Sequence, residues 1–444
     1  MPLRAGWRTV RGREDARVPR LEGLRGARSS RLFLPLKCGI VAAMATQDAT
    51  LPGPAERAAA LKARRQLKMA RSAHAYVRGN TKNFYEWLEG STGETVPAGP
   101  AIWICGDCHA GNIGPIASAK GTVSIQIRDL DQTVIGNPAH DLIRLGLSMA
   151  SAARGSDLPG VTTARMMEQI IEGYEQSFGA GADADEEWPT VVQAAMKAAV
   201  KRKWKDLARE RIEDTKPTIP LGKTFWPLAT EEREAVDALF ATDAGRRLVT
   251  ALKSRPDDAD IEVVDAAYWV KGCSSLGLLR CAVLVAVGGK KGEVCLIDIK
   301  EAVPALAPRA AAAEMPADHG ERVVAGAWHL SPALGDRMLA AKVLDRPVFV
   351  RELLPQDLKF DVADLTCEEA MRLARFLATV VGKAHARQMD EPTRQSWQEV
   401  LSQRRSKTLD APSWLWASVV DLLATHEKAY LEHCRRYATE SAGA

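Results

Sequence analysis

The chain has 444 residues, of which 46% are hydrophobic and 26% are charged. This is the composition of a globular protein, and it excludes a disordered chain, a collagen-like chain and a disulfide scaffold. Sixty basic residues against 56 acidic ones leave a formal net charge of +4, an excess too small to indicate a nucleic-acid partner, so none is expected.

The cysteines and the apolar stretches indicate where the protein resides. Eight cysteines lack the spacing of a disulfide framework, and a chain of this size does not need disulfides for a stable core. The nearest approach to a membrane span, residues 32–44, is interrupted by Pro35 and Lys37 and falls short of the 18 apolar residues that a span requires. We therefore expect reduced thiols, no membrane partner and a cytoplasmic location.

Residues 1–43 differ from the rest because they are rich in arginine and lack periodicity. A secretory signal would place a short basic segment directly before an apolar one, whereas here the apolar stretch begins only at Leu32. We expect either a disordered extension or a start codon assigned too early, with Met44 as the true initiator.

Helices and strands follow in distinct regions. Residues 54–95 are rich in helix formers and predict one or two basic amphipathic helices with a break at Gly79. Residues 96–255 predict two short strands, near 101–107 and 121–131, followed by helices that extend to about Ser254.

The second half of the chain predicts a β-rich region followed by helices. Residues 256–360 contain strand patterns joined by glycine-rich turns. Residues 361–440 return to helix, which opens with Thr366 and Glu369 in a capping-box pattern. The fold class expected is α+β, with a small β-rich lobe inside a mainly helical protein.

The stretch WICGDCHAGN, residues 103–112, has two incompatible interpretations. Cys105, Cys108 and His109 fit the C-x-x-C-H pattern of c-type haem attachment. Asp107 and Asn112 have the spacing of the base and the metal ligand in a kinase catalytic loop.

The haem interpretation lacks its usual accompaniments. A c-type cytochrome needs a secretion signal and a distal axial ligand, and the chain has no convincing signal. A zinc or redox C-x-x-C site is a further alternative, but no second cysteine pair completes a four-thiolate site. We expect the two thiols to be packing groups, and a Soret band would show otherwise.

The kinase interpretation requires oxygen ligands and a carboxylate near the acceptor. Asp107, Asn112 and Asp129 supply these groups in the right order. Asp131 is a second candidate metal ligand, since it points to the same side of its strand as Asp129. Any one of these residues alone is equally typical of a turn or a helix cap.

Three segments, GDCHAGN, IRDLD and GNPAHDL, together resemble the catalytic segment of the aminoglycoside phosphotransferase and choline kinase type of protein kinase-like fold. The resemblance implies that Asp107 is the catalytic carboxylate and that Asn112 and Asp129 are Mg²⁺ ligands. It also implies that His109 shapes the loop and that Asp141 buttresses it from the next helix.

The order of the segments differs from that of a kinase, in which the glycine-rich loop and the strand lysine come before the catalytic loop. Here the turn GCSSLG, residues 272–277, and Lys300 follow it. The strand RPVFVREL, which contains Glu352, takes the place of the strand that leads to the adenine hinge. The residues expected to bind the nucleotide are Gly272, Ser274, Ser275, Gly277, Lys300 and Glu352. A plain hairpin is the alternative for the turn.

When the chain is read cyclically, from 261 to about 390 and then from about 100 to 255, its elements fall into kinase order. We therefore expect a circularly permuted, two-lobe kinase-like fold, with a mainly helical large lobe and a small antiparallel β lobe.

The arrangement from AHAYVRG, which contains Arg78, to GKAHARQ also resembles an uncharacterised bacterial family, domain of unknown function 2252 (DUF2252). Its members share an early GD-x-H-x-x-N-x-G segment, a D-x-D-x-T segment and a later glycine-rich turn with K-E-A. The resemblance covers about residues 65–390, gives Arg78 a supporting place and names no substrate.

The function expected is ATP- and Mg²⁺-dependent phosphoryl transfer to a hydroxyl or amine of a small-molecule acceptor, whose site residues 162–254 would shape. Nucleotidyl transfer from the same site is an alternative. A nucleotide-binding regulator without turnover is another, because Ser274 replaces a glycine and the carboxylate partner of Lys300, either Glu314 or Glu321, is uncertain.

Overall fold

The computed structural model describes residues 51–442, apart from residues 91–95, 180–187, 214, 274, 290–291, 361–364, 404 and 406–408. Residues 51–444 form one compact unit. The expected N-terminal extension therefore lies outside the described residues.

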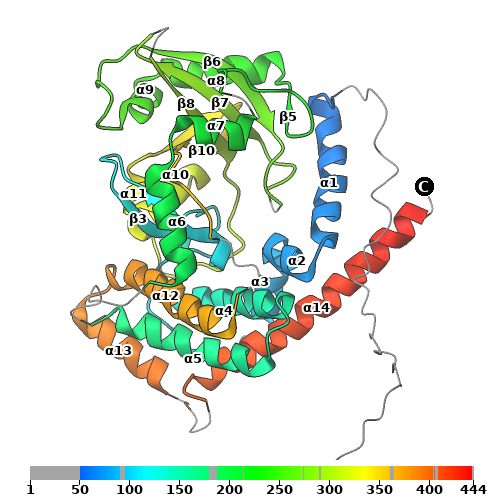
Figure 1. Ribbon diagram of the computed structural model, residues 1–444, viewed down its shortest axis with the longest axis vertical. Coiled ribbons are helices and arrows are strands. Elements are labelled where there is room, and N and C mark those ends of the chain that lie inside the picture. Colours follow the sequence, from blue (N-terminus) through cyan, green and yellow to red (C-terminus); the bar gives the residue numbers. More distant parts are fainter. Residues whose placement is uncertain are drawn as a thin grey trace, which may run out of the picture. The chain divides into compact units, whose positions relative to one another are not determined.

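Helices make up most of this unit (Figure 1). The helices are α1 Pro54–Ala70, α2 Ala73–Gly79, α3 Thr81–Glu89, α4 Pro138–Gly155, α5 Gly160–Gln176, α6 Thr190–Lys201, α7 Trp204–Ile212, α8 Thr230–Ala241, α9 Asp243–Thr250, α10 His319–Leu330, α11 Pro332–Gly335, α12 Cys367–Ala386, α13 Glu391–Ser402 and α14 Ser413–Ala442. Among the described residues, no helix is long and apolar enough to cross a membrane.

The strands form one large antiparallel sheet and two small pairs. The strands are β1 Ile102–Ile104, β2 Ile113–Ala117, β3 Val123–Ile127, β4 Val134–Gly136, β5 Phe225–Trp226, β6 Ile261–Trp269, β7 Arg280–Val287, β8 Glu293–Glu301, β9 Met338–Val343 and β10 Arg346–Leu353. Six of them are ordered β5-β6-β7-β8-β10-β9, while β1 pairs with β4 and β2 with β3. The predicted α+β class is confirmed.

The large sheet is covered on both faces, which explains why β7 is buried along its whole length and is apolar after its first residue, Arg280. Side chains alternate between the faces of a strand. On β8, Ile297 and Ile299 join the core beneath α8 and α9, whereas Leu296 packs in the cluster that contains α7. Lys300 belongs to the same face as Leu296, so the sequence period places this lysine on the α7 side.

The other large core lies among α4, α5, α12 and α14. Helix α12 begins as the sequence predicts, because the Thr366 hydroxyl accepts a hydrogen bond from the Glu369 N–H at 3.3 Å. Every residue of α4 from Pro138 to Ala153 is buried. The polar side chains of α4 are therefore enclosed, and they require partners within the protein.

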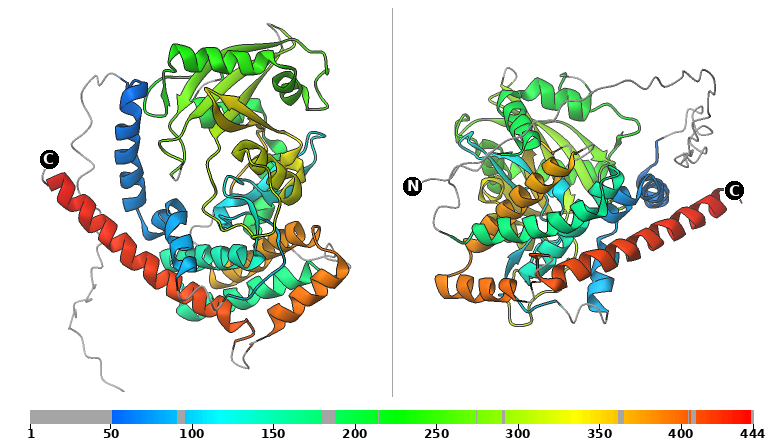
Figure 2. Two further views of the ribbon diagram at one scale, coloured as in Figure 1. Left: turned by 180° about the vertical axis from the view of Figure 1, so that it is seen from behind. Right: turned by 60° about the horizontal axis from the view of Figure 1, so that its bottom comes forward.

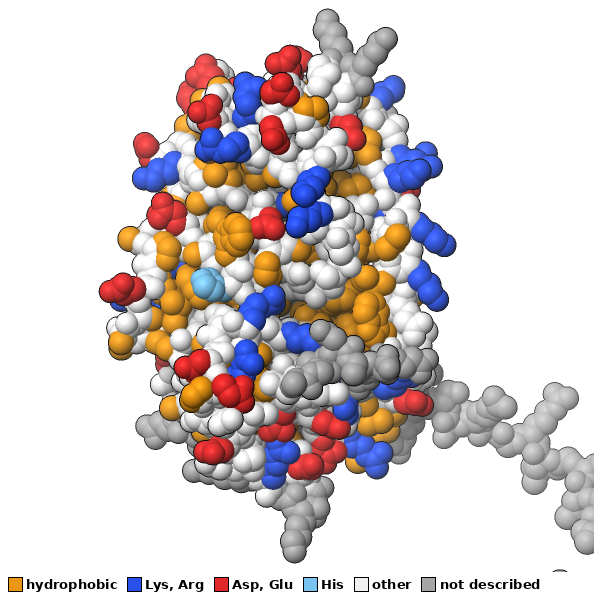
Figure 3. Space-filling model, turned by 90° about the vertical axis from the view of Figure 1, so that its left-hand side faces the viewer, with side chains coloured by type: hydrophobic (Ala, Val, Ile, Leu, Met, Phe, Trp, Pro, Cys, Tyr) orange, Lys and Arg blue, Asp and Glu red, His pale blue; other side chains and the backbone are white. Residues whose placement is uncertain are grey.

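The structure differs from the boundary expected at residue 255. Strand β5 pairs with β6, and α8 and α9 pack on the large sheet. The sheet layer thus begins before residue 256. On the face shown in Figure 3, acidic and basic side chains are interspersed, in keeping with the nearly balanced composition.

Candidate functional site

The loop that follows β1 is held in place by a side chain of α4. Asp141 accepts hydrogen bonds from the backbone N–H groups of Cys105 at 2.7 Å and Gly106 at 2.9 Å. Gly106 has a φ of +74°, and a Cβ there would overlap the carbonyl of Gln132. Only glycine adopts this conformation readily at such a close approach. Asp141 and Gly106 together fix the path by which the chain reaches Asp107.

The Asp107 carboxylate is buried and paired. Its Oδ1 accepts a hydrogen bond from Arg144 Nε at 2.8 Å, and the Arg144 side chain is 1% exposed. A second Arg144 nitrogen donates to the Val77 carbonyl at 2.9 Å. The sequence did not indicate Arg144, although its spacing of three residues from Asp141 on α4 places both on one side of the helix.

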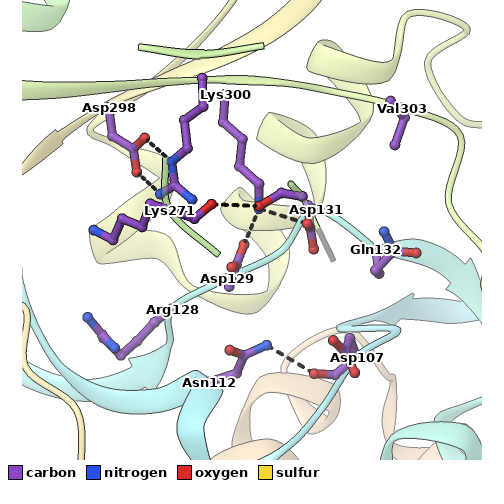
Figure 4. Close-up of polar contacts among 12 residues, drawn as sticks. Asp107, Asn112, Arg128, Asp129, Asp131, Gln132, Lys271, Asp298, Lys300 and Val303 are labelled. Atoms are coloured by element: carbon purple, nitrogen blue, oxygen red, sulfur yellow. Dashed lines mark hydrogen bonds and ion pairs between the residues drawn. The ribbon is translucent and has the colours of Figure 1, made fainter. Parts of the chain in front are cut away.

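Asn112 lies directly beside the loop (Figure 4). Its Nδ2 donates to the Asp107 carbonyl at 3.0 Å, so its Oδ1 is available to another ligand. His109 is buried between them and α4, and burial lowers its pKa to about 3. His109 is therefore neutral at physiological pH.

Two aspartates that follow β3 meet a lysine from β8 (Figure 4). Lys300 Nζ lies 2.7 Å from Asp131 Oδ2 and 3.4 Å from Asp129 Oδ1. The residues are 169 and 171 positions apart in the sequence. Chain segments from the two halves of the sequence therefore meet at one point.

The charges of Lys300, Asp129 and Asp131 affect one another's protonation. Burial disfavours the ionised form of Asp129, but the positive charges of Lys300, Arg351 and Arg280 outweigh it and hold the pKa of this carboxyl below its ordinary range. Burial and the charge of Asp129 raise the pKa of Asp131 despite Lys300. Asp129 is thus the carboxylate that stays ionised.

A second ion pair supports Lys300 from the sheet. Arg280 on β7 is directly opposite Lys300 in the register. Arg280 Nε and Nη2 bind the two oxygens of Asp298 at 2.8 and 2.5 Å. The sequence did not indicate this bidentate pair. Strand alternation does place Asp298 and Lys300 on the same face.

The glycine-rich turn lies between β6 and β7. Gly272 has a φ of +93°, and its carbonyl accepts a hydrogen bond from Lys68 Nζ at 2.8 Å. Ser275 is buried, whereas Gly277, with a φ of +105°, is exposed. Ser274 lies outside the described residues.

These groups enclose a cavity of about 300 Å³, which we call the Lys300 cavity. Among its lining residues, those expected from the sequence are Arg78, Asp107, His109, Asn112, Asp129, Asp131, Gly272, Ser275 and Lys300. Lys68, Arg71 and Lys359 also line it and were not expected.

Glu352 lies elsewhere. Its two oxygens bind Arg255 at 2.8 Å each, and it lines a different cavity of about 620 Å³. Glu314, in the loop before α10, and Glu321, in the first turn of α10, form no ion pair with Lys300, whose carboxylate partners are Asp129 and Asp131.

Helix α10 contributes an arginine instead. Arg322 donates to the carbonyls of Asp131 at 3.0 Å, Val303 at 2.9 Å and Thr133. It therefore anchors the backbone that carries Asp131.

The two cysteines of the loop are packing groups. Cys105 and Cys108 are 0% exposed, which leaves no room for a porphyrin on their sulfur atoms. They lie within 4.8 Å of an Asp141 oxygen. The hydrogen bond to Cys108, together with burial, raises the pKa of Cys105, and burial raises that of Cys108. Protonated thiols beside a carboxylate that already accepts two N–H groups are poor metal ligands.

The oxygen atoms around Lys300 suit a different cation. Asp129, Asp131 and Asn112 offer carboxylate and amide oxygens, the hard ligands that Mg²⁺ prefers. The donor set therefore fits the cation expected from the sequence.

Comparison with known proteins places the chain in a family. No curated protein and no solved structure matches the chain. The family model described as an uncharacterized protein conserved in bacteria matches residues 57–436, which is most of the chain and includes every residue of the Lys300 cavity. The chain therefore belongs to this bacterial family, DUF2252.

Proposed function

We propose that this protein is an ATP- and Mg²⁺-dependent phosphotransferase with a kinase-like fold in circularly permuted order. The observation that supports the proposal is the meeting of Lys300 with Asp129 and Asp131 in a cavity that Asp107 and Asn112 also line. A phosphoryl-transfer site needs a cation for the phosphates, oxygen ligands for Mg²⁺ and a carboxylate near the acceptor.

Each group has a role that follows from its surroundings. Lys300 and the turn that contains Gly272 hold the nucleotide phosphates. Asp129 and Asn112 hold Mg²⁺, with Asp131 as a further ligand; when bound, the ion neutralises charge on the phosphates. Asp107 orients the acceptor hydroxyl or amine and accepts its proton, while Arg144 keeps this carboxylate in one orientation.

The order of the elements supports the permutation. The sheet that carries Lys300 follows the catalytic loop in the sequence, yet the two segments face one cavity. Helix α12, which would lead directly into the loop in a kinase, ends with His385 at 3.2 Å from Asp141. The contact between α12 and the helix that holds the loop is what the proposed permutation expects.

Nucleotide binding and turnover test the proposal separately. Lys300→Met and Asp129→Asn are expected to weaken Mg²⁺-dependent ATP binding at least tenfold by isothermal titration calorimetry. Asp107→Asn is expected to leave ATP binding within about twofold and to slow ADP formation by roughly 10²–10⁴-fold, the range for loss of a general base. Lys342→Met, on the exposed side of β9, is the control. Absence of Mg²⁺-dependent nucleotide binding in the wild type contradicts the proposal.

A regulator that binds nucleotide without turnover is a second candidate. It is favoured by the pairing of Asp107 with buried Arg144, because the guanidinium occupies one of the two carboxylate oxygens that an acceptor group could approach. Tight ATP binding with equal ADP formation by wild type and Asp107→Asn identifies this candidate. Release of pyrophosphate rather than ADP identifies nucleotidyl transfer.

A further inference from the structure

A second cavity of about 150 Å³ adjoins the Lys300 cavity, and the two share Asn112, Asp129, Gly272, Arg280 and Lys359 in their walls. We call it the cationic cavity. Its charged lining comes from segments far apart in the sequence: Arg128, Arg211, Lys271, Arg280, Arg351 and Lys359. The carboxylates in its wall are Asp129 and Asp357.

Some of these cations have carboxylate partners. Arg280 is paired bidentately with Asp298, and Arg351 lies 3.7 Å from the same carboxylate. Arg211 is paired with Glu210 at 3.0 Å. These pairs keep three guanidinium groups in place at the wall of the cavity.

The other three cations lack such partners among the described residues. Arg128 donates to the carbonyl of Asp357 at 2.9 Å, and its buried Nε has no partner. Lys271 lies over the Trp269 ring, with its Nζ 3.8 Å from the centroid. Among the described residues, neither Lys271 nor Lys359 forms an ion pair, and only the charges of Asp298 on Lys271 and of Asp129 on Lys359 act on them from nearby carboxylates.

The titration behaviour agrees with this imbalance. Burial and the neighbouring charges of Arg280 and Arg211 lower the pKa of Lys271 well below its ordinary range. Burial and the nearby charges of Arg128 and Arg78 lower the pKa of Lys359 to about 8. Holding buried positive charges close together costs free energy, and binding of an anionic ligand offsets that cost.

We propose that the cationic cavity binds a phosphate group carried by the acceptor, so that the transferase acts on a small molecule that is already phosphorylated. This inference rests on the proposed function. The cavity of about 150 Å³ has room for one phosphate group. Guanidinium and ammonium groups together bind a dianion more strongly than they bind a single carboxylate.

The position of the cavity assigns the phosphate to the acceptor. The donor phosphates are accounted for by Lys300, the Gly272 turn and the oxygen ligands of Mg²⁺ in the Lys300 cavity. The two cavities meet at residues that include Asn112 and Asp129, and Lys68 lines only the Lys300 cavity. An acceptor anchored there extends past Asn112 toward Asp107.

The test measures phosphate binding and nucleotide binding separately on the full chain. Inorganic phosphate is titrated into the wild type, Lys271→Met, Arg128→Met and Lys342→Met by isothermal titration calorimetry without nucleotide, and Mg²⁺–ATP is titrated in parallel. We expect Lys271→Met and Arg128→Met to weaken phosphate binding at least tenfold and to leave Mg²⁺–ATP binding within twofold. Lys342→Met is expected to behave as the wild type. Far-ultraviolet circular dichroism checks that each variant is folded.

Three results overturn the inference. The first is a wild type that does not bind phosphate. The second is a loss of Mg²⁺–ATP binding in Lys271→Met equal to the loss of phosphate binding, which assigns the cavity to the donor. The third is phosphate binding by a wild type that binds no nucleotide, which refutes the proposed function and, with it, the acceptor. Failure of the phosphate titration alone leaves the proposed function standing.

Discussion

At the scale of single residues, Asp141 determines whether the loop that carries Asp107 keeps its shape. Asp141→Ala removes the acceptor of two buried N–H groups, and an unsatisfied buried donor costs about 1–3 kcal/mol. We expect urea denaturation to show a loss of roughly 3–5 kcal/mol in the free energy of unfolding. Asp141→Asn retains one oxygen and is expected to lose about half of this. Equal stability of Asp141→Ala and wild type contradicts the assignment.

Buried histidines make the fold sensitive to acid. Burial lowers the pKa of His426 and His140 to about 4 and that of His109 to about 3, against an ordinary value near 6.5 in the unfolded chain. Below pH 6.5 the unfolded state therefore binds protons that the native state does not, so stability falls as the pH falls.

The size of this effect can be measured at one residue. Between pH 7 and pH 5, His426 alone is expected to account for a loss of about 2 kcal/mol. His426→Met removes the titrating group, so its free energy of unfolding is expected to fall by about 2 kcal/mol less than that of the wild type over this interval. Identical pH dependence of the two proteins would show that His426 takes up a proton as readily in the folded state as in the unfolded state.

The residues of the site were predictable to different degrees. Asp107, Asn112 and Asp129 lie within one short segment, where local spacing carries information about a shared loop. Lys300 was found because it ends a strand after a glycine-rich turn. Arg144 and Asp298 were missed because their partners, Asp107 and Arg280, are chosen by tertiary contacts that local sequence does not encode.

At the scale of elements, α1 is attached to the sheet layer by one buried ion pair. Arg57 of α1 binds Glu232 of α8 at 2.7 and 2.9 Å and lies over the Tyr268 ring. Glu232→Ala leaves a buried charge without its partner, which is expected to cost about 3–5 kcal/mol. Arg233→Met, which breaks an exposed pair on the same helix, is expected to cost less than about 1 kcal/mol.

A double-mutant cycle separates the pair from its surroundings. Arg57→Met combined with Glu232→Ala is expected to be less destabilising than the sum of the two single changes by roughly 0.5–3 kcal/mol, as found for residues in contact. Strict additivity in urea denaturation would show that the two side chains do not interact in solution.

The helices and strands themselves were predicted better than the contacts between them. The period of α12 and the alternation of β3 and β8 are properties of short windows, and these elements occur where expected. Strand β5 has two residues, too few for a periodic pattern. The packing of α8 and α9 on the sheet depends on contacts with β6 and β9, so their sequence alone assigned them to the wrong layer.

At the scale of the whole molecule, α1, near the start of the described chain, contacts α14, at its end (Figure 2). The Tyr430 hydroxyl donates to the Ala70 carbonyl at 3.2 Å, and His433 contacts the Gln66 carbonyl at 3.1 Å. The sequence number rises along α1 as it falls along α14, so the two helices are antiparallel where they meet. The start of α1 and the end of α14 therefore lie toward the same end of this helix pair.

This arrangement predicts that a circular permutation can bring the segments of the chain into the order of a kinase. The permutant begins at Asp258 and runs to Ala442. It continues through a linker of about 20 Gly and Ser residues into residues 51–257. Its new termini lie in the exposed loop between α9 and β6. A linker of this length spans roughly 25 Å, compared with about 18 Å from Pro54 to Gln66 and about 14 Å from His433 to Ala442 along the helices.

The permutant is expected to unfold cooperatively, with a free energy of unfolding within a few kcal/mol of residues 51–442 in their natural order, and to bind Mg²⁺–ATP within about threefold. A second permutant opened between Val283 and Leu284, inside buried β7, is the matched control and is expected not to fold, because it breaks the central ladder of the sheet. If both permutants fail to fold, chain order is part of what holds Lys300 against Asp129. If only the control fails, the site depends on the contacts between the two segments and not on which of them comes first.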